Sequence, residues 1–294
     1  MRITDQRIFQ DASTFTAKAR QADEAAQAQV STGLRVQHAG DDAAAAGLMV
    51  SHGLAEARLS AIASGATSAS AELASADNAL QGVNDALLNA TQLATQMAND
   101  TVSPSQRSSA AAQVTQLSAT IVGLLNTKDG SRYLFGGNQD SKPPFDSTGA
   151  YLGDTGVRQV EVAPGVMQPA SVRADVALKG AGGGVDVLAA LSKLQAALTS
   201  NDAAGISASL TALKAGTDQV SQARAAAGIS IGTLTAGARI ATTQRDAQTA
   251  SITALGGADE VQAASSLALA QRALEASITA SAQAFQMTLL NKIQ

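Results

Sequence analysis

The side chains best suited to metal or redox chemistry are scarce in this chain. Its 294 residues include two histidines, His38 and His52, and no cysteine. A structural zinc site needs four cysteine, histidine or carboxylate ligands that converge on one point. Neither histidine belongs to a set with the spacing of such a motif. We therefore expect no metal and no other cofactor, and we interpret both histidines as solvated residues near helix ends.

Two further stretches could be taken for catalytic or nucleotide-binding motifs. Asp41 and Asp42 are adjacent carboxylates, but adjacent side chains on a turn point in different directions, and no partner acid or base is in view. An aspartate just before a helix accepts hydrogen bonds from its free N–H groups. The glycines at 180–184 lack the third glycine of a dinucleotide loop, because Val185 stands in its place. We expect a helix cap, a glycine hinge and no enzyme.

The composition favours thin helical packing over a thick globular core. The chain is 45% hydrophobic but only 2% aromatic, and much of its apolar content is alanine, the best helix former. Its formal charge of −4 gives no electrostatic reason to bind nucleic acid. No stretch approaches the ~18 consecutive apolar residues of a membrane helix. The first residues also lack the apolar region of a classical signal peptide, so the sequence predicts no membrane association.

Two long stretches carry the apolar repeat of packed helices. Between 62 and 97, apolar residues follow alternating steps of four and three. They are Ile62, Ala66, Ala69, Leu73, Ala76, Leu80, Val83, Leu87, Ala90, Ala94 and Met97. A similar repeat runs from 206 to 255, with polar interruptions at Arg224, Arg245 and Gln248. A further helix is expected from Ser103, a good N-cap before a proline, to about residue 128.

Apolar side chains also mark the two terminal helices, which we expect over 4–33 and 259–293. Gly33 and the Gly256-Gly257 pair separate them from the long repeats. The apolar stripe near the start includes Ile8, Phe9, Ala12 and Phe15, which we place on one helix face. The stripe near the end includes Val261, Leu267, Leu274, Ile278, Phe285 and Leu289.

Prolines and alternating residues between 131 and 184 predict a small β-rich insert. Prolines at 143, 144, 164 and 169 make a continuous helix improbable. Period-two patterns around 157–162 and 172–178 indicate short strands. Three domains follow: terminal helices (1–35 and 259–294), a helical rod (36–130 and 185–257) and the insert (131–184). The fold class is mainly α, a long antiparallel coiled-coil-like rod built from the N- and C-terminal halves.

Four stretches resemble the flagellin-like axial proteins of bacterial flagella. They are MRIT at the start, QVSTGLRVQHAGDDAAAAG at 29–47, LLNTKDGSRYLFGGNQDSKPPF at 124–145 and AYLGDTGVRQVEVAPG at 150–165. The third is similar to an element of the branch that joins hook and filament. The family residues it carries are Tyr133, Leu134, Phe135, Gly136, Gly137, Pro143, Pro144 and Phe145. The second departs from the family, which has proline, serine and proline where this chain has Ala39, Gly40 and Ala43.

The resemblance implies a structural role in motility. Such proteins leave the cell through the flagellar type III apparatus without a cleaved signal, become part of the extracellular flagellum, and order their terminal helices on assembly. The implied partners are copies of the chain in a ring, another hook-associated protein, flagellin, and an export chaperone at the C-terminal helix.

The assembly contact would use the terminal apolar residues, that is Ile8, Phe9, Phe15, Leu267, Leu274, Ile278, Phe285 and Leu289. Two alternatives remain, a flagellin-type filament subunit and a cytoplasmic coiled-coil scaffold.

Overall fold

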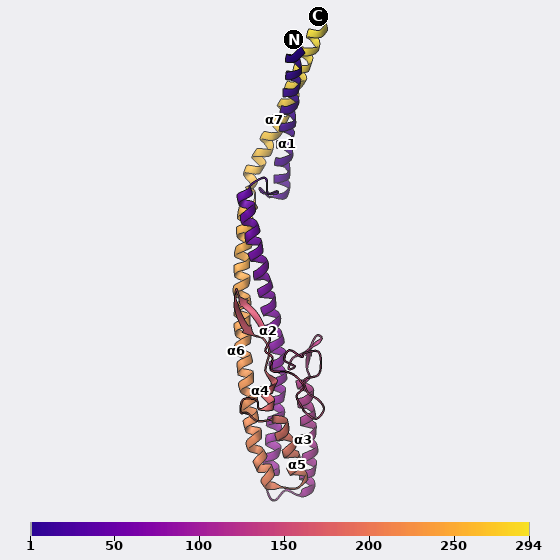
Figure 1. Ribbon diagram of the computed structural model, residues 1–294, viewed down its shortest axis with the longest axis vertical. Helices are drawn as coiled ribbons and strands as arrows, with labels where there is room; N and C mark the ends of the chain where they lie inside the picture. The colour runs from indigo at the N-terminus through magenta and orange to yellow at the C-terminus, as the bar shows by residue number, and fades with distance from the viewer. Residues whose placement is uncertain (1, 294) are drawn as a thin grey trace. The chain divides into compact units, whose positions relative to one another are not determined.

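The computed structural model describes the backbone of residues 2–293 and the side chains of residue 7 and residues 9–283. The protein is mainly α-helical, with two small antiparallel two-stranded sheets, as the sequence predicted (Figure 1). The elements are α1 (Arg2–Thr32), α2 (Ala43–Met97), α3 (Pro104–Leu125), β1 (Lys128–Asp129), β2 (Arg132–Tyr133), β3 (Gln159–Ala163), β4 (Val166–Pro169), α4 (Ala174–Lys179), α5 (Val187–Thr199), α6 (Ala203–Gly256) and α7 (Glu260–Ile293).

The chain divides into two compact units. The terminal unit comprises residues 1–57 and 245–294, and the central unit comprises residues 58–244. In the terminal unit α1 and α7 lie side by side (Figure 1). The breaks predicted at Gly33 and Gly256 are present and bond to each other, since the N–H of Arg35 donates to the carbonyl of Gly256 at 2.7 Å. The N–H of Ala258 donates in turn to the carbonyl of Gly33 at 2.9 Å.

The central unit is built around α2 and α6, which run antiparallel within it. All the seam residues predicted on α2 from Ile62 to Ala94 are buried, and Met97 is half-buried. On α6 every seventh residue is buried: Ile206, Leu213, Val220, Ala227, Leu234 and Ala241. The helices α3 and α5 pack against each other beside this seam and share its hydrophobic core (Figure 1).

Two polar interruptions of the α6 repeat have partners on α2. In the central unit the guanidinium of Arg224 donates to the Asp77 carboxylate at 2.9 Å. This bond, followed by the charge of Asp77, raises the pKa of Arg224 above its usual value. In the terminal unit the Oε1 of Gln248 lies 2.5 Å from the Nδ1 of His52. The interpretation of His52 as a solvated helix-end residue was therefore wrong, because its ring is half-buried between two helices.

The expected strand over residues 172–178 was also wrong. Residues 174–179 form the short helix α4, because Ala174, Ala177 and Leu178 bury one helical face at the i, i+3, i+4 spacing. Gly180 ends this helix in the left-handed conformation, with φ of 76°. The glycine stretch continues as a turn, across which the ammonium of Lys179 pairs with the carboxylate of Asp186 at 2.5 Å. Period two and period 3.6 cannot be told apart over so short a segment.

Aspartate and serine side chains cap several of the helices. The cap predicted at Ser103 is present in a reciprocal capping box with Gln106, and Pro104 is the first helical residue of α3. Asp186 and Asp259 accept from the first N–H groups of α5 and α7. The predicted end of α3 was too late, because the helix stops at Leu125 and Asn126 is its C-cap.

Candidate assembly surfaces

The terminal helices pack through a narrow seam of small residues. On α1 the residues that face α7 are Ala12, Thr16, Ala19, Asp23 and Ala26, at alternating steps of four and three. On α7 they are Ala263, Leu267, Ala270, Leu274, Ser277 and Ser281. The hydroxyl of Thr16 lies 3.1 Å from that of Ser277 and 3.2 Å from that of Ser281. Small side chains let the two helices approach closely.

The two phenylalanines of α1 flank the seam instead of filling it. Phe9 is 55% exposed and Phe15 is 66% exposed. The two are six positions apart, a rotation of about 240° on a helix of 3.6 residues per turn. They therefore do not share the single face that the sequence suggested, and they project on opposite sides of the seam. On α7 Val261 is exposed and also lies outside the seam.

A groove runs along the flank that carries Phe9. Its volume is about 480 Å³, and its walls come from α1 and α7. The described lining residues are Phe9, Ala12, Ser13, Thr16, Ala17, Arg20, Ile278, Ser281 and Ala282. Of the predicted assembly residues, Leu267 and Leu274 are thus half-buried in the seam, and Ile278 is exposed in the groove. The side chains of Ile8, Phe285 and Leu289 lie outside the described residues.

Asp41 and Asp42 organise the turn between α1 and α2, each in its own way. Asp42 caps α2, because its Oδ1 accepts from the N–H of Ala45 at 3.0 Å. Its Oδ2 accepts from the guanidinium of Arg35 at 2.9 Å, and that guanidinium also donates to the carbonyl of Leu255. These bonds, the one from Ala45 first, lower the pKa of Asp42. The predicted cap is confirmed for Asp42.

The neighbouring Asp41 stabilises the turn by accepting hydrogen bonds from its backbone. Its Oδ2 accepts from the backbone N–H groups of His38 at 2.8 Å and Gln37 at 3.0 Å. These two bonds, the one from His38 first, lower the pKa of Asp41. The two carboxylates therefore bond to different partners, and neither is arranged as a general acid or base.

The aromatic residues of 129–145 form a local core at the end of α3. Phe135 and Phe145 are fully buried, and Leu134 packs against them at the edge of the core. The ring of Phe145 lies 5.1 Å from that of Tyr151. Burial, followed by the charge of Asp175, raises the pKa of Tyr151 to about 12. Residues 129–145 thus form a hydrophobic corner.

Tyr133, the third aromatic residue of the stretch, behaves differently. It is half-buried in the β1–β2 hairpin, and the ammonium of Lys128 lies over its ring at 4.6 Å from the centroid. The turn of this hairpin contains Gly130, whose φ of 58° favours glycine. Asp129 therefore ends β1, and the turn of the hairpin is formed by Gly130 and Ser131.

The structure explains why glycine occupies two positions of this stretch and how one of its prolines is held. A Cβ on Gly136 would lie 2.5 Å from the carbonyl oxygen of Gln139. A Cβ on Gly137, where φ is 68°, would lie 2.1 Å from the Asp154 carboxylate. Pro144 is buried and its carbonyl accepts from Leu152, whereas Pro143 is exposed.

Asn126 fixes the corner to the end of α3, a role that sequence reasoning missed. Its side-chain amide donates to the carbonyl of Phe145 at 2.9 Å, and its side-chain oxygen accepts from the N–H of the same residue at 3.0 Å. Both backbone groups of Phe145 are thereby satisfied as the side chain enters the core. The signal available in the sequence was the asparagine at the expected helix end, which lies inside the family-like stretch.

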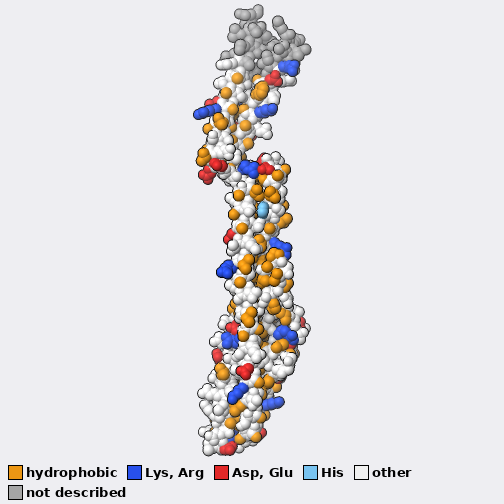
Figure 2. Space-filling model, turned by 90° about the vertical axis from the view of Figure 1, so that its left-hand side faces the viewer, with side chains coloured by type: hydrophobic (Ala, Val, Ile, Leu, Met, Phe, Trp, Pro, Cys, Tyr) orange, Lys and Arg blue, Asp and Glu red, His pale blue; other side chains and the backbone are white. Residues whose placement is uncertain are grey.

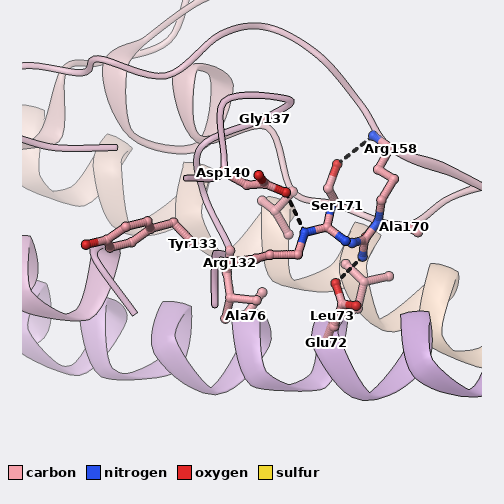
Figure 3. Close-up of a pocket in the computed structure, with 12 residues that line it drawn as sticks. Glu72, Leu73, Ala76, Arg132, Tyr133, Gly137, Asp140, Arg158, Ala170 and Ser171 are labelled. Atoms are coloured by element: carbon pink, nitrogen blue, oxygen red, sulfur yellow. Dashed lines mark hydrogen bonds and ion pairs between the residues drawn. The ribbon is translucent and has the colours of Figure 1, made fainter. Parts of the chain in front are cut away.

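Ion pairs anchor the corner and the segment after it. Arg158 pairs with Glu72 of α2 and donates to the carbonyl of Ala170, and Arg132 pairs with Asp140 inside the corner (Figure 3). Between them is a cavity of about 20 Å³. That volume accommodates about one water molecule, so it is a packing space and not a substrate pocket.

Arg107 is another structural residue that the sequence did not reveal. Its side chain is 4% exposed, and it donates to the carbonyls of Met97 and Asn99 at 3.0 Å each. It also donates to the side-chain oxygen of Asn201 at 2.6 Å. One guanidinium thus joins the α2–α3 turn to the α5–α6 turn. Asn201 has a positive φ of 57°, which asparagine tolerates better than most residues.

The surface gives little sign of chemistry. Among the described residues no group of three or more histidine, cysteine or acidic side chains could hold a metal ion. In the same part of the chain, no helix has both the length and the apolar character that a bilayer crossing requires. On the face shown in Figure 2, basic and acidic side chains are interspersed, with no gathering of one sign. What the geometry offers is packing surface.

Comparison with known proteins explains this architecture. Residues 5–140 match the family model of the bacterial flagellin N-terminal helical region. The match covers α1, α2, α3 and most of the aromatic corner. This part of the chain is therefore similar to flagellin. Flagellar hook-associated protein 3 of Escherichia coli K12 is 33% identical to this chain over 127 residues. That alignment covers 42% of the chain and 40% of the relative, so the match spans less than half the length of either.

Solved structures show the same fold. A putative flagellar hook-associated protein from Vibrio parahaemolyticus has a TM-score of 0.65 at 22% identity, over 72% of this chain and 97% of that one. FlgL from Bacillus cereus has a TM-score of 0.59 at 23% identity, over 70% and 99% respectively. At these identities the likeness concerns the fold alone.

Proposed function

We propose that this chain is a structural subunit of the bacterial flagellum, located at the junction of hook and filament. The supporting observation is the corner at 129–145, where Phe135, Phe145 and the two tight glycines form a compact core on the end of α3. This corner carries the residues that resemble the junction branch. The curated relative that aligns with the chain is likewise named hook-associated protein 3.

The proposed mechanism is mechanical. Copies of the chain would form a ring through the terminal helices, between another hook-associated protein and flagellin. The exposed Phe15 and the groove beside Phe9 support such contacts, because large apolar groups exposed beside a cleft mark protein interfaces. The packing cavity and the dispersed charges support a role without catalysis. Export by the type III apparatus and a chaperone on the C-terminal helix belong to the same proposal.

Deletion of the gene tests this role. Cells without the protein should keep their hooks, lose their filaments and release flagellin into the medium, because flagellin would have no platform on which to assemble. Electron microscopy of the cells and immunoblots of the medium give the two measurements. Restoring the intact chain should restore the filament. Filaments of normal length on the deletion strain would refute the proposal.

One specific observation favours an alternative. The matching family model describes flagellin itself, so the chain could form the filament instead of the junction. Copy number separates the two roles, because a filament subunit greatly outnumbers a junction subunit. Quantitative mass spectrometry of sheared filaments and of intact hook-basal bodies should find the chain enriched at the hook. Its presence as the bulk protein of the filaments would establish the alternative.

A further inference from the structure

Charged side chains of opposite sign surround the small cavity beside the corner. They are Glu72 of α2, Arg132 and Asp140 of the corner, and Arg158 of the segment that follows it. Figure 3 shows the side chains of Arg132 and Arg158 entering this space from opposite sides. Buried residues such as Leu73, Ala76 and Ala170 form apolar parts of the wall. The cavity is thus small, polar and set between α2 and the corner.

The guanidinium of Arg158 uses only part of its hydrogen-bonding capacity. Its Nη2 bonds to the carboxylate of Glu72 and donates to the carbonyl of Ala170 at 3.1 Å. Its Nε is buried and has no hydrogen-bond partner among the residues that the structure describes. A buried donor without an acceptor costs free energy, so such groups in folded proteins usually bond to the protein or to ordered water.

Size and charge restrict what the acceptor can be. The cavity volume of about 20 Å³ is that of about one water molecule, which is too small for a phosphate or an organic ligand. Arg158 pairs with Glu72 and Arg132 pairs with Asp140, so the formal charges around the cavity cancel. The site therefore does not favour an anion. Water suits it, because water can accept from the Nε and donate to a carboxylate that has lone pairs to spare.

We propose that one internal water molecule binds in this cavity, where it accepts from the Nε of Arg158 and donates to a lining carboxylate. Arg158 already joins several segments, since its backbone N–H donates to the hydroxyl of Ser171 at 3.0 Å and its side chain reaches Glu72 of α2. The water completes the bonding of this guanidinium and fixes its orientation on α2. The inference is independent of the junction role, because it would apply equally to a filament subunit.

Nuclear magnetic resonance of the natural chain tests the site. Arg224 is the matched control, because its Nε donates to Asp77 at 2.9 Å and its side chain is 28% exposed, against 24% for Arg158. The Hε of Arg158 should show a negative laboratory-frame Overhauser effect to water, the sign that a long-lived water gives. Rotating-frame spectra separate this effect from proton exchange. The Hε of Arg224 should show no such effect, and equal signals at the two arginines, or none at Arg158, would overturn the inference.

A crystal structure grown with bromide as the anion tests the identity of the ligand. Electron density for one water should lie within about 3 Å of the Nε of Arg158 and of a lining carboxylate. An anomalous bromide peak in the cavity would overturn the proposal in favour of an anion site. A cavity without density at atomic resolution would overturn it as well.

Two alanines of α2 make a matched pair of variants. Ala76 lines the cavity, whereas Ala79 is buried on the same helix but is not part of the lining. In Ala76→Val the added methyl groups should enter the cavity, displace the water and remove the Overhauser effect at Arg158. Ala79→Val should keep the effect, although both variants add the same volume to a packed helix. A folded Ala76→Val protein that keeps the effect would refute the site, and the two measurements on the natural chain decide if this variant does not fold.

Discussion

Some single residues join segments that are distant in the sequence, and Arg107 is the clearest example. A buried guanidinium normally has a carboxylate partner, but Arg107 donates to two carbonyl oxygens and one asparagine. Nothing in the sequence around Arg107 distinguishes it from a surface arginine, because its partner Asn201 lies in a turn far away in the chain. The caps at Ser103 and Asp186 were predictable, since their partners are three residues away.

Substituting Arg107 should therefore destabilise the central unit. Arg107→Met removes the donor that serves the carbonyls of Met97 and Asn99 and the side-chain oxygen of Asn201, which should cost about 2–4 kcal/mol in the free energy of unfolding. Arg58→Met is the matched control, because Arg58 is well exposed and pairs with Glu161 at the surface. It should cost less than about 1 kcal/mol. Urea unfolding followed by circular dichroism measures both, and equal losses would contradict this role for Arg107.

The pKa of Asp42 predicts how the α1–α2 turn responds to acid. Because the folded chain lowers this pKa, the carboxylate stabilises the fold above its unfolded pKa of about 3.9. That contribution is lost as the pH falls through the lowered folded value. The urea midpoint should thus fall less between about pH 5 and pH 2 in Asp42→Asn than in the natural chain. Arg35→Gln should be intermediate, since the bond from Ala45 remains. Parallel curves for all three proteins would show that Asp42 does not contribute.

At the scale of elements, regular repeats were predictable and short irregular segments were not. The seam of α2 follows from its apolar spacing alone, and the breaks at Gly33 and Gly256 follow from glycine. A strand was predicted at 172–178, but residues 174–179 form a helix. The prediction failed because so short a segment does not distinguish the period of two of a strand from the period of 3.6 of a helix. The sequence shows that Arg224 and Gln248 interrupt the apolar repeat of α6. It does not reveal their partners, because Asp77 and His52 come close to them only in the folded chain.

Two glycines of α6 make a matched test of how the β3–β4 hairpin sits on this helix. A Cβ on Gly237 would lie 2.8 Å from the Cβ of Val162 in β3, whereas a Cβ on Gly232 would meet nothing within 4 Å. Gly237→Ala should therefore destabilise the central unit by about 1 kcal/mol or more, because the hairpin must shift. Gly232→Ala should stabilise it by roughly 0.5–1 kcal/mol through helix propensity. Thermal unfolding of both variants gives the comparison, and shifts of the same sign would contradict this packing.

For the whole molecule, the sequence predicted the class of fold and the family-like corner, but not the arrangement of the terminal residues. Phe9 and Phe15 belong to one apolar stripe in the sequence, yet they flank a seam made of smaller residues. The seam accounts for the pairing of α1 with α7, and Phe15 lies exposed beside it.

The most direct test of the junction role is the position of the chain in the flagellum. One cysteine replaces the exposed Ser147, two residues after the corner, and because the natural chain has none, maleimide-gold labels that site alone. Electron microscopy of flagella from motile cells should show gold in one narrow band at the boundary of hook and filament. Gold distributed along the filament, or absent from the flagellum, would contradict the account.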